Sequence, residues 1–123
     1  MAIEMSKISP SKDLQSVLSG APQGNGRVLF VSLHQSPLYP GTGLRSEDNC
    51  LNFPVKPGTG GGEYLAVLEK ALEEVRAFDP GVVGVSAGFD TYKNDPITAL
   101  RLDVEDYRGI GRLIGALGKP VFS

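Results

Sequence analysis

The chain has 123 residues, 41% of them hydrophobic and 21% charged, and its formal net charge is -2. These proportions are typical of one folded domain, and they exclude a chain that is disordered throughout. With 12 basic and 14 acidic residues, the chain has no strong field of either sign, so neither nucleic acid nor an anionic membrane is expected as a partner.

The cellular location is predicted from what the sequence lacks. Cys50 is the single cysteine and cannot form an internal disulfide, and residues 1–14 contain no apolar stretch typical of a signal peptide. No apolar run approaches the roughly 20 residues that cross a bilayer. We therefore expect a cytoplasmic protein without a membrane segment, in which Cys50 is a small buried hydrophobic residue.

The first strand is predicted directly after a polar segment. Residues 1–26 are rich in Ser, Pro, Gly, Lys and Gln, and we interpret them as a poorly ordered arm before an α/β domain at 27–123. Residues 27–34, RVLFVSLH, form a nearly continuous apolar run, which is typical of a parallel strand buried on both faces. The prolines and glycines of 35–49 then predict a long, structured loop.

A helix and a second strand follow. A short apolar patch at 52–55 is ended by the turn KPGTGGG at 56–62. From 63 to 78 apolar residues recur every three or four positions, which predicts an amphipathic helix, and the DPG at 79–81 ends it. Residues 82–87, VVGVSA, predict a second buried strand.

The rest of the chain repeats this alternation. After a polar loop at 91–101, the apolar residues between 104 and 117 form another helical face, with Asp103 as the expected N-terminal cap. Val121 and Phe122 begin a third strand. Strands that alternate with helices predict an α/β fold of three layers, in which a parallel sheet has helices packed on its faces.

Polar residues gather where the two long strands end. Ser32 and His34 end the first strand, and Ser86 and Asp90 close the second. Ligands of open α/β sheets bind beyond these strand ends, where Asp90 would bind a metal or act as a base. By position alone, an aspartate that caps the loop is the favoured interpretation. A lone histidine such as His34 is more often a hydrogen-bonded structural residue than a metal ligand.

The glycine-rich turn at 58–62 invites comparison with a phosphate-binding loop, but it lacks the pattern. Glu63 follows it, no Lys-Ser or Lys-Thr pair comes next, and an acidic first turn repels phosphate while it suits the helix dipole. We interpret the turn as the start of a helix. The hypothesis of a flavodoxin-like phosphate or nucleotide binder is therefore supported by this turn and the α/β alternation alone.

Several separated blocks resemble one known family in order and spacing. They are VSLH at 31–34, PLYPGTG at 37–43, NFPV at 52–55, SAGFD at 86–90 and NDP at 94–96. Over about residues 28–123 they resemble successive motifs of the zinc-dependent histone deacetylase, acetoin-utilisation and acetylpolyamine amidohydrolase superfamily. The resemblance implies an arginase-like α/β fold and hydrolysis of acetyl-lysine or related N-acetyl amides by a metal-bound water.

The resemblance also implies roles for single residues. Asp90 matches a zinc-binding aspartate, which reverses the interpretation from position alone. Ser32 and the carbonyl of Leu33 match positions that hold a monovalent cation, K+ for example, in some members. Tyr39 matches an aromatic position that walls the acyl channel, whereas His34 matches a position that is not a zinc ligand.

Most of the family's catalytic machinery has no counterpart in this sequence. The family's tandem histidines and Asp-x-His metal pair lie upstream of the VSLH block, and its oxyanion tyrosine lies just beyond the strand at 121–122. With one zinc ligand of three, we expect an incomplete deacetylase domain that does not hydrolyse acetyl-lysine alone, and whose exposed sheet edges favour self-association. The alternative is a non-catalytic module of this fold that binds a partner protein or an acyl-lysine side chain.

Overall fold

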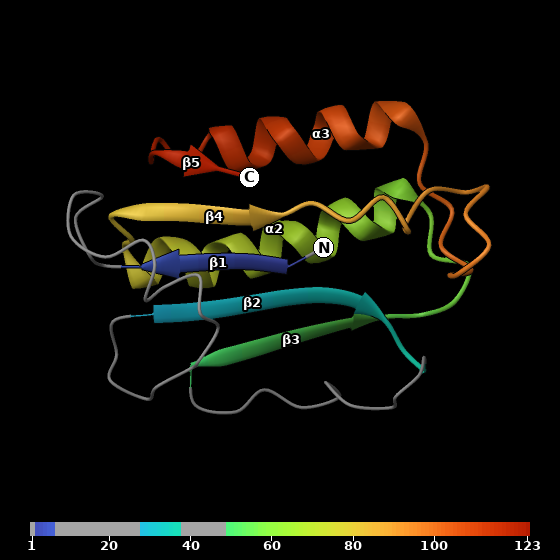
Figure 1. Cartoon of the computed structure of the whole chain (residues 1–123), viewed down its shortest axis with the longest axis horizontal. Coiled ribbons are helices and arrows are strands. Elements are labelled where there is room, and N and C mark those ends of the chain that lie inside the picture. Colours follow the sequence, from blue (N-terminus) through green and yellow to red (C-terminus); the bar gives the residue numbers. More distant parts are fainter. Residues whose placement is uncertain (1, 7–27, 38–48) are drawn as a thin grey trace.

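Both long apolar runs form strands of one sheet, as predicted. The computed structural model describes residues 2–6, 28–37 and 49–123, in which five strands lie in the order β3-β2-β1-β4-β5 (Figure 1). The strands are β1 (Ala2–Ser6), β2 (Val28–Gln35), β3 (Cys50–Val55), β4 (Val82–Ser86) and β5 (Val121–Phe122), and the helices are α2 (Gly61–Phe78) and α3 (Val104–Gly115). From β3 onward, strands and helices alternate as expected.

Strand β2 has one buried face rather than two. Its residues alternate between half-buried and buried, and Leu29, Val31 and Leu33 are at most 8% exposed. Phe30 and His34 lie on the half-buried face. The prediction of a strand buried on both faces is therefore wrong for the described residues, because a continuous apolar run does not reveal how many of its faces are covered.

The apolar patch at 52–55 belongs to a strand that begins earlier, at Cys50. β3 pairs in parallel with β2, with Leu33 opposite Phe53, and it forms one edge of the described sheet. Its signal in the sequence is weak because Pro54 interrupts the run. Proline lacks an amide donor and is tolerated in a sheet chiefly on edge strands.

Residues 2–6 form a central strand, which corrects the prediction of a poorly ordered arm for this segment. β1 runs antiparallel to both neighbours, and Ile3 pairs with Val31 of β2 and with Val85 of β4. The segment AIEMS is short and carries a charged residue, so its strand depends on pairing with distant residues on both sides rather than on a local signal. The rest of the predicted arm lies outside the described residues.

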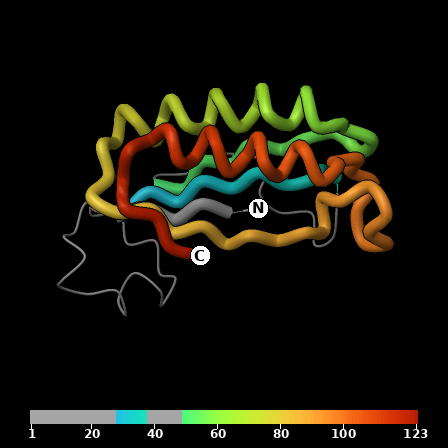
Figure 2. The backbone as a smooth tube through the Cα atoms, turned by 90° about the horizontal axis from the view of Figure 1, so that it is seen from above, coloured from blue at the N-terminus to red at the C-terminus, as the bar shows by residue number. Residues whose placement is uncertain are grey.

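Both described helices cover the same face of the sheet (Figure 2). They approach closely at Gly109 of α3, where a Cβ would lie 3.1 Å from a methyl carbon of Leu65 on α2. The described residues thus supply two of the three predicted layers, the sheet and one helical layer. The pairs β2–β3 and β4–β5 are parallel, as predicted, and β1 is the antiparallel exception.

The hydrophobic core lies between α2 and the sheet. The buried face of α2 consists of Tyr64, Leu68, Ala71, Leu72 and Val75. The last four belong to the predicted apolar face, Tyr64 does not, and the predicted Leu65 and Phe78 are half-buried. The residues of the buried face share one cluster with the buried face of β2 and with Leu100 and Leu102 from the loop before α3. Neither described helix is long and apolar enough to cross a membrane.

The glycine turn starts helix α2, as predicted. Gly60 is the N-cap residue, and no side chain caps it. The carboxylate of Asp106 lies against Gly61 instead, so close that a Cβ on Gly61 would be 2.0 Å from the Asp106 Cγ. A negative charge is favourable there because a helix N-terminus carries partial positive charge. One of the chain's own carboxylates therefore occupies the place that a phosphate would need.

Candidate functional site

The carboxyl ends of β2 and β4 enclose an open cleft of about 430 Å³. Strand β1 lies between the two strands, and its residue Ala2 pairs with Ser32 on one side and Ser86 on the other. The cleft is lined by Ser32, Leu33, His34, Ser86, Ala87, Gly88 and Asp90. The structure therefore brings together all the predicted strand-end residues that it describes.

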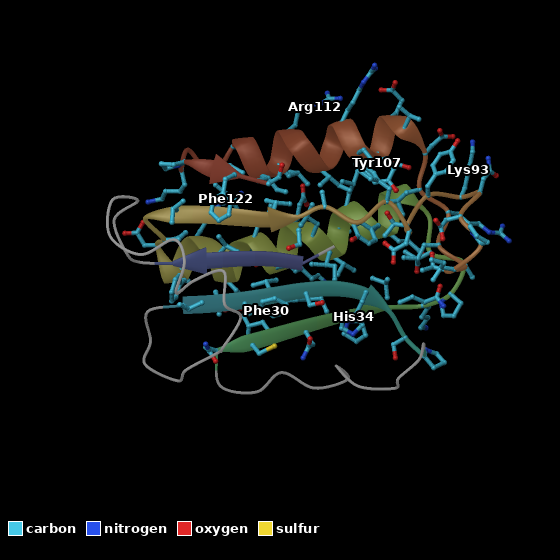
Figure 3. The ribbon with its side chains drawn as sticks, viewed as in Figure 1. Phe30, His34, Lys93, Tyr107, Arg112 and Phe122 are labelled. Atoms are coloured by element: carbon cyan, nitrogen blue, oxygen red, sulfur yellow. The ribbon has the colours of Figure 1, made fainter. Side chains whose placement is uncertain are left out.

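A hydrogen bond joins the side chains of Ser32 and His34. The two residues lie on the same face of β2, since side chains two positions apart on a strand point to the same side, and Ser32 Oγ is 2.9 Å from His34 Nδ1. Figure 3 shows His34 near the carboxyl end of β2. This bond agrees with the interpretation of His34 as a hydrogen-bonded residue. When the hydroxyl donates to Nδ1, the lone pairs of the Ser32 oxygen stay available as acceptors.

Asp90 is held in the turn that follows β4. One of its carboxylate oxygens lies 3.0 Å from the point where a Cβ on Gly88 would be, so a larger residue at Gly88 would push the carboxylate aside. The backbone carbonyl of Asp90 accepts a hydrogen bond from the hydroxyl of Thr98. These restraints keep a half-buried carboxylate at the end of the strand, where the sequence predicts it.

The loop after Asp90 is tied to the N-terminus of α3. The hydroxyls of Thr91 and Tyr107 are 2.7 Å apart, and Lys93 forms an ion pair with Asp103 (Figure 3). Asp103 caps α3, as predicted, within a capping box that Asp106 completes. Helix α3 therefore anchors the loop that carries the turn at Asp90.

The ion pair of Lys93 and Asp103 predicts a pH dependence of stability. The hydrogen bond from Lys93, together with that from the first N–H of the helix, lowers the pKa of Asp103, and the hydrogen bond to Asp103 raises the pKa of Lys93. A lowered carboxyl pKa stabilises the fold above about pH 4, and this stability is lost as the pH falls through the folded pKa. A raised lysine pKa stabilises the fold below about pH 10.4, and this contribution to stability is lost as the pH rises through the pKa of the folded state. We therefore expect the urea midpoint to fall at both ends of this window.

Asp103→Asn separates the titration from the helix cap, because asparagine still caps a helix but does not ionise. Urea unfolding of both proteins from about pH 2 to about pH 7 should show a shallower acid decline for the variant. An acid decline of equal steepness in the two proteins would contradict the role of Asp103.

The described residues do not fit a complete zinc site. A catalytic zinc needs three protein ligands, and no group of three or more His, Cys, Asp or Glu side chains in the described part of the chain is placed to hold a metal ion. Ser32 and Leu33 nevertheless share the cleft with Asp90, so the positions matched to two different ions are neighbours. Tyr39, the predicted channel residue, lies outside the described residues.

Gln35 supports this site in a role that no sequence pattern predicted. It ends β2 with 8% of its surface exposed, and its Oε1 accepts a hydrogen bond of 2.7 Å from the N–H of Ala99. The bond ties β2 to the loop that also binds the carbonyl of Asp90. The sequence feature that could have indicated this role is a polar residue at the end of an apolar run. A buried amide side chain there needs a hydrogen-bond partner elsewhere in the fold.

Residues 19–122 match the histone deacetylase domain. The probable deacetylase of Archaeoglobus fulgidus is 40% identical over 101 residues, which cover 76% of this chain and 28% of that protein. Acetylpolyamine amidohydrolase 1 of Pseudomonas aeruginosa is 36% identical over 103 residues, which cover 76% of this chain and 30% of that protein. The chain therefore spans less than a third of the length of these relatives.

The fold agrees with these matches. The crystal structure of an acetylpolyamine aminohydrolase from Burkholderia pseudomallei matches with a TM-score of 0.71 and 31% sequence identity, over 76% of this chain and 30% of that one. The matched domain includes β2 to β5 and the cleft at Asp90, whereas β1 lies outside it. The predicted deacetylase-like α/β fold is confirmed. This chain belongs to the histone deacetylase family.

Proposed function

We propose that this chain contributes part of a metal-dependent site that hydrolyses N-acetyl amides, such as acetyl-lysine or an acetylated polyamine, and that Asp90 is a metal-binding carboxylate of that site. The observation that carries the proposal is the cleft, which Asp90 from the turn after β4 lines together with Ser32 and Leu33 from β2. The relatives support the substrate class, since their names are those of deacetylases and acetylpolyamine amidohydrolases.

The chain's own contribution is the position of oxygen ligands. A carboxylate, a hydroxyl and a backbone carbonyl are the kinds of donor that hard cations prefer, and Asp90, Ser32 and Leu33 supply one of each. Zinc, when bound in such a site, polarises the amide carbonyl and activates water. A single carboxylate does not fix zinc in a defined geometry. We therefore propose that the chain needs further ligands and does not hydrolyse an acetyl amide by itself.

The first test uses the purified chain with Zn2+ and an acetyl-lysine peptide. We expect no zinc-dependent release of acetate above the background of the metal alone. Zinc-dependent turnover that Asp90→Ala abolishes would overturn the proposed inactivity and would point to ligands outside the described residues. Binding of the peptide without zinc and without turnover would instead favour the alternative, a non-catalytic acyl-lysine-binding module.

The second test places the segment in a complete relative. Residues 28–122 replace the matched segment of the Burkholderia aminohydrolase, and acetate release from an acetylated polyamine is measured. Loss of residues that merely support metal ligands already costs about 10- to 100-fold, so we expect Asp90→Asn to lower kcat/KM of the chimera by more than about 100-fold. Glu105→Gln, at an exposed residue of α3 that pairs with Arg108, is the matched control.

The chimera gives a result in either direction. A loss confined to Asp90→Asn, with circular dichroism unchanged, supports the metal-binding role. A folded chimera that keeps full activity with Asp90→Asn contradicts it.

We also propose that the chain self-associates, on separate grounds. β3 and β5 are the edges of the described sheet, and unpaired strand edges favour the addition of a strand from another molecule.

A further inference from the structure

A second cavity lies between the sheet and the helices. Its volume is about 360 Å³, and its lining runs from the end of β4 to α3 and shares Ala87 and Gly88 with the cleft. Its walls are largely aliphatic and include Val85 of β4, Val121 of β5, and Ile110 and Ile114 of α3. No acidic, basic or histidine side chain lines it. The cavity therefore suits an uncharged ligand.

Tyr64 of α2 is a buried polar residue of this cavity whose hydroxyl has no partner among the described residues. Tyr64 is among the lining residues and is 0% exposed, and its hydroxyl has no hydrogen-bond partner in the described part of the chain. Burial raises the pKa of this hydroxyl, as does the negative charge of nearby Asp90, so it stays protonated at neutral pH. A buried hydroxyl without a partner is unfavourable and uncommon in folded proteins. A ligand with an acceptor atom would supply the missing bond.

Two glycines of α3 leave room in the cavity. Gly111 and Gly115 both line it, and they stand one helical turn apart on the same side of α3. A Cβ on either residue would meet no atom within 4 Å. Both glycines are exposed, so they stand at the rim of the cavity, where a larger side chain would narrow its opening.

The mouth of the cavity is aromatic. Phe89 is 66% exposed, and its ring packs edge-on against that of Tyr107, with 5.4 Å between the centroids. Tyr107 lies between α3 and the loop that follows β4 (Figure 3). Because the Tyr107 hydroxyl is already bonded to Thr91, Tyr64 carries the buried hydroxyl that is left for a ligand, beside the exposed Ser123.

We propose that this cavity binds a small neutral aromatic or alicyclic molecule with one hydrogen-bond acceptor, such as a ketone, which accepts from the Tyr64 hydroxyl. Ligand sites of roughly 300–1,000 Å³ with apolar walls and few polar groups are typical of small-molecule binding. The hydroxyl exposes no surface as the structure stands, so a ligand reaches it by moving the side chains around it, and the new hydrogen bond offsets that movement. The proposal does not depend on the hydrolytic function of the cleft.

The test compares two probes of the same shape by NMR titration of the whole chain. 1-Indanone carries a ketone oxygen, and 1-methyleneindane carries a methylene group in its place, which accepts no hydrogen bond. We expect the ketone to bind about fivefold more tightly, as one neutral hydrogen bond predicts. In Tyr64→Phe the ratio of the two dissociation constants should fall to about one, while the urea midpoint stays equal or rises because an unpartnered buried hydroxyl is removed.

A second variant fills the cavity. Gly111→Leu places a side chain in the open space, and we expect both probes to bind at least about tenfold more weakly while the helix is kept, since leucine is a better helix former than glycine. Arg112→Leu, at the neighbouring exposed position (Figure 3), adds the same side chain outside the cavity and should leave binding unchanged. The proposal is overturned by failure of both probes to bind, by equal affinities in the natural chain, by a ketone preference that persists in Tyr64→Phe, or by binding that survives Gly111→Leu.

Discussion

Leu68→Ala is expected to lower the free energy of unfolding by about 3 kcal/mol. Leu68 lies on the buried face of α2, is 0% exposed, and belongs to the cluster between the helix and the sheet. The substitution removes the Cγ and the two Cδ atoms from the core and leaves a cavity that the surrounding residues fill only in part. Because a domain of this size has a total stability of only about 5–15 kcal/mol, urea unfolding followed by circular dichroism should show the change clearly.

Glu69→Ala is the matched control for that experiment. Glu69 is the next residue of the same helix and is exposed, so its replacement should change the free energy of unfolding by no more than about 0.5 kcal/mol. Equal effects of the two substitutions would mean that α2 does not bury the face that the structure assigns to it.

Gly61→Ala is expected to destabilise the chain by about 1–3 kcal/mol, although alanine is the better helix former. The added Cβ would lie 2.0 Å from the Asp106 Cγ. The Asp106 carboxylate has little freedom to withdraw, because its Oδ2 accepts a hydrogen bond of 2.7 Å from the N–H of Asp103. Relief of the clash therefore breaks the capping box of α3 or separates the two helix N-termini. Urea unfolding measures the cost.

Gly62→Ala provides the contrast, since a Cβ on Gly62 would meet no atom within 4 Å. We expect this variant to be neutral or slightly more stable than the natural chain. When Asp106→Ala has already removed the carboxylate, Gly61→Ala should cost less than it does in the natural chain. A cost that is unchanged in that background would show that the Asp106 side chain is not the obstacle.

The helices are predictable because their signals are local. In α2 the three- and four-residue spacing of apolar side chains marks the face that becomes buried. In α3 an aspartate stands at the N-cap and another stands three residues later, and these two residues form the observed capping box. Both signals depend on residues within one or two helical turns, so no knowledge of distant parts of the chain is needed.

Strands β1 and β3 are not predictable in the same way. β1 takes its hydrogen bonds from β2 and β4, which lie far along the chain, and β3 is interrupted by Pro54, which an edge position tolerates. The buried bond between Gln35 and the N–H of Ala99 likewise joins residues that no local pattern connects. Such pairings depend on which segments meet in space.

The sequence by itself determined the family, the alternation of strands and helices from β3 onward, and the place of Asp90 after a buried strand, because motif order and hydrophobic spacing are properties of neighbouring residues. Only the tertiary structure decided that β1 separates β2 from β4, that both described helices cover one face, and that Asp90 shares a cleft with Ser32 and Leu33. It also left the Tyr64 hydroxyl buried in the described fold without a partner. These features depend on contacts between distant segments, which sequence spacing does not encode.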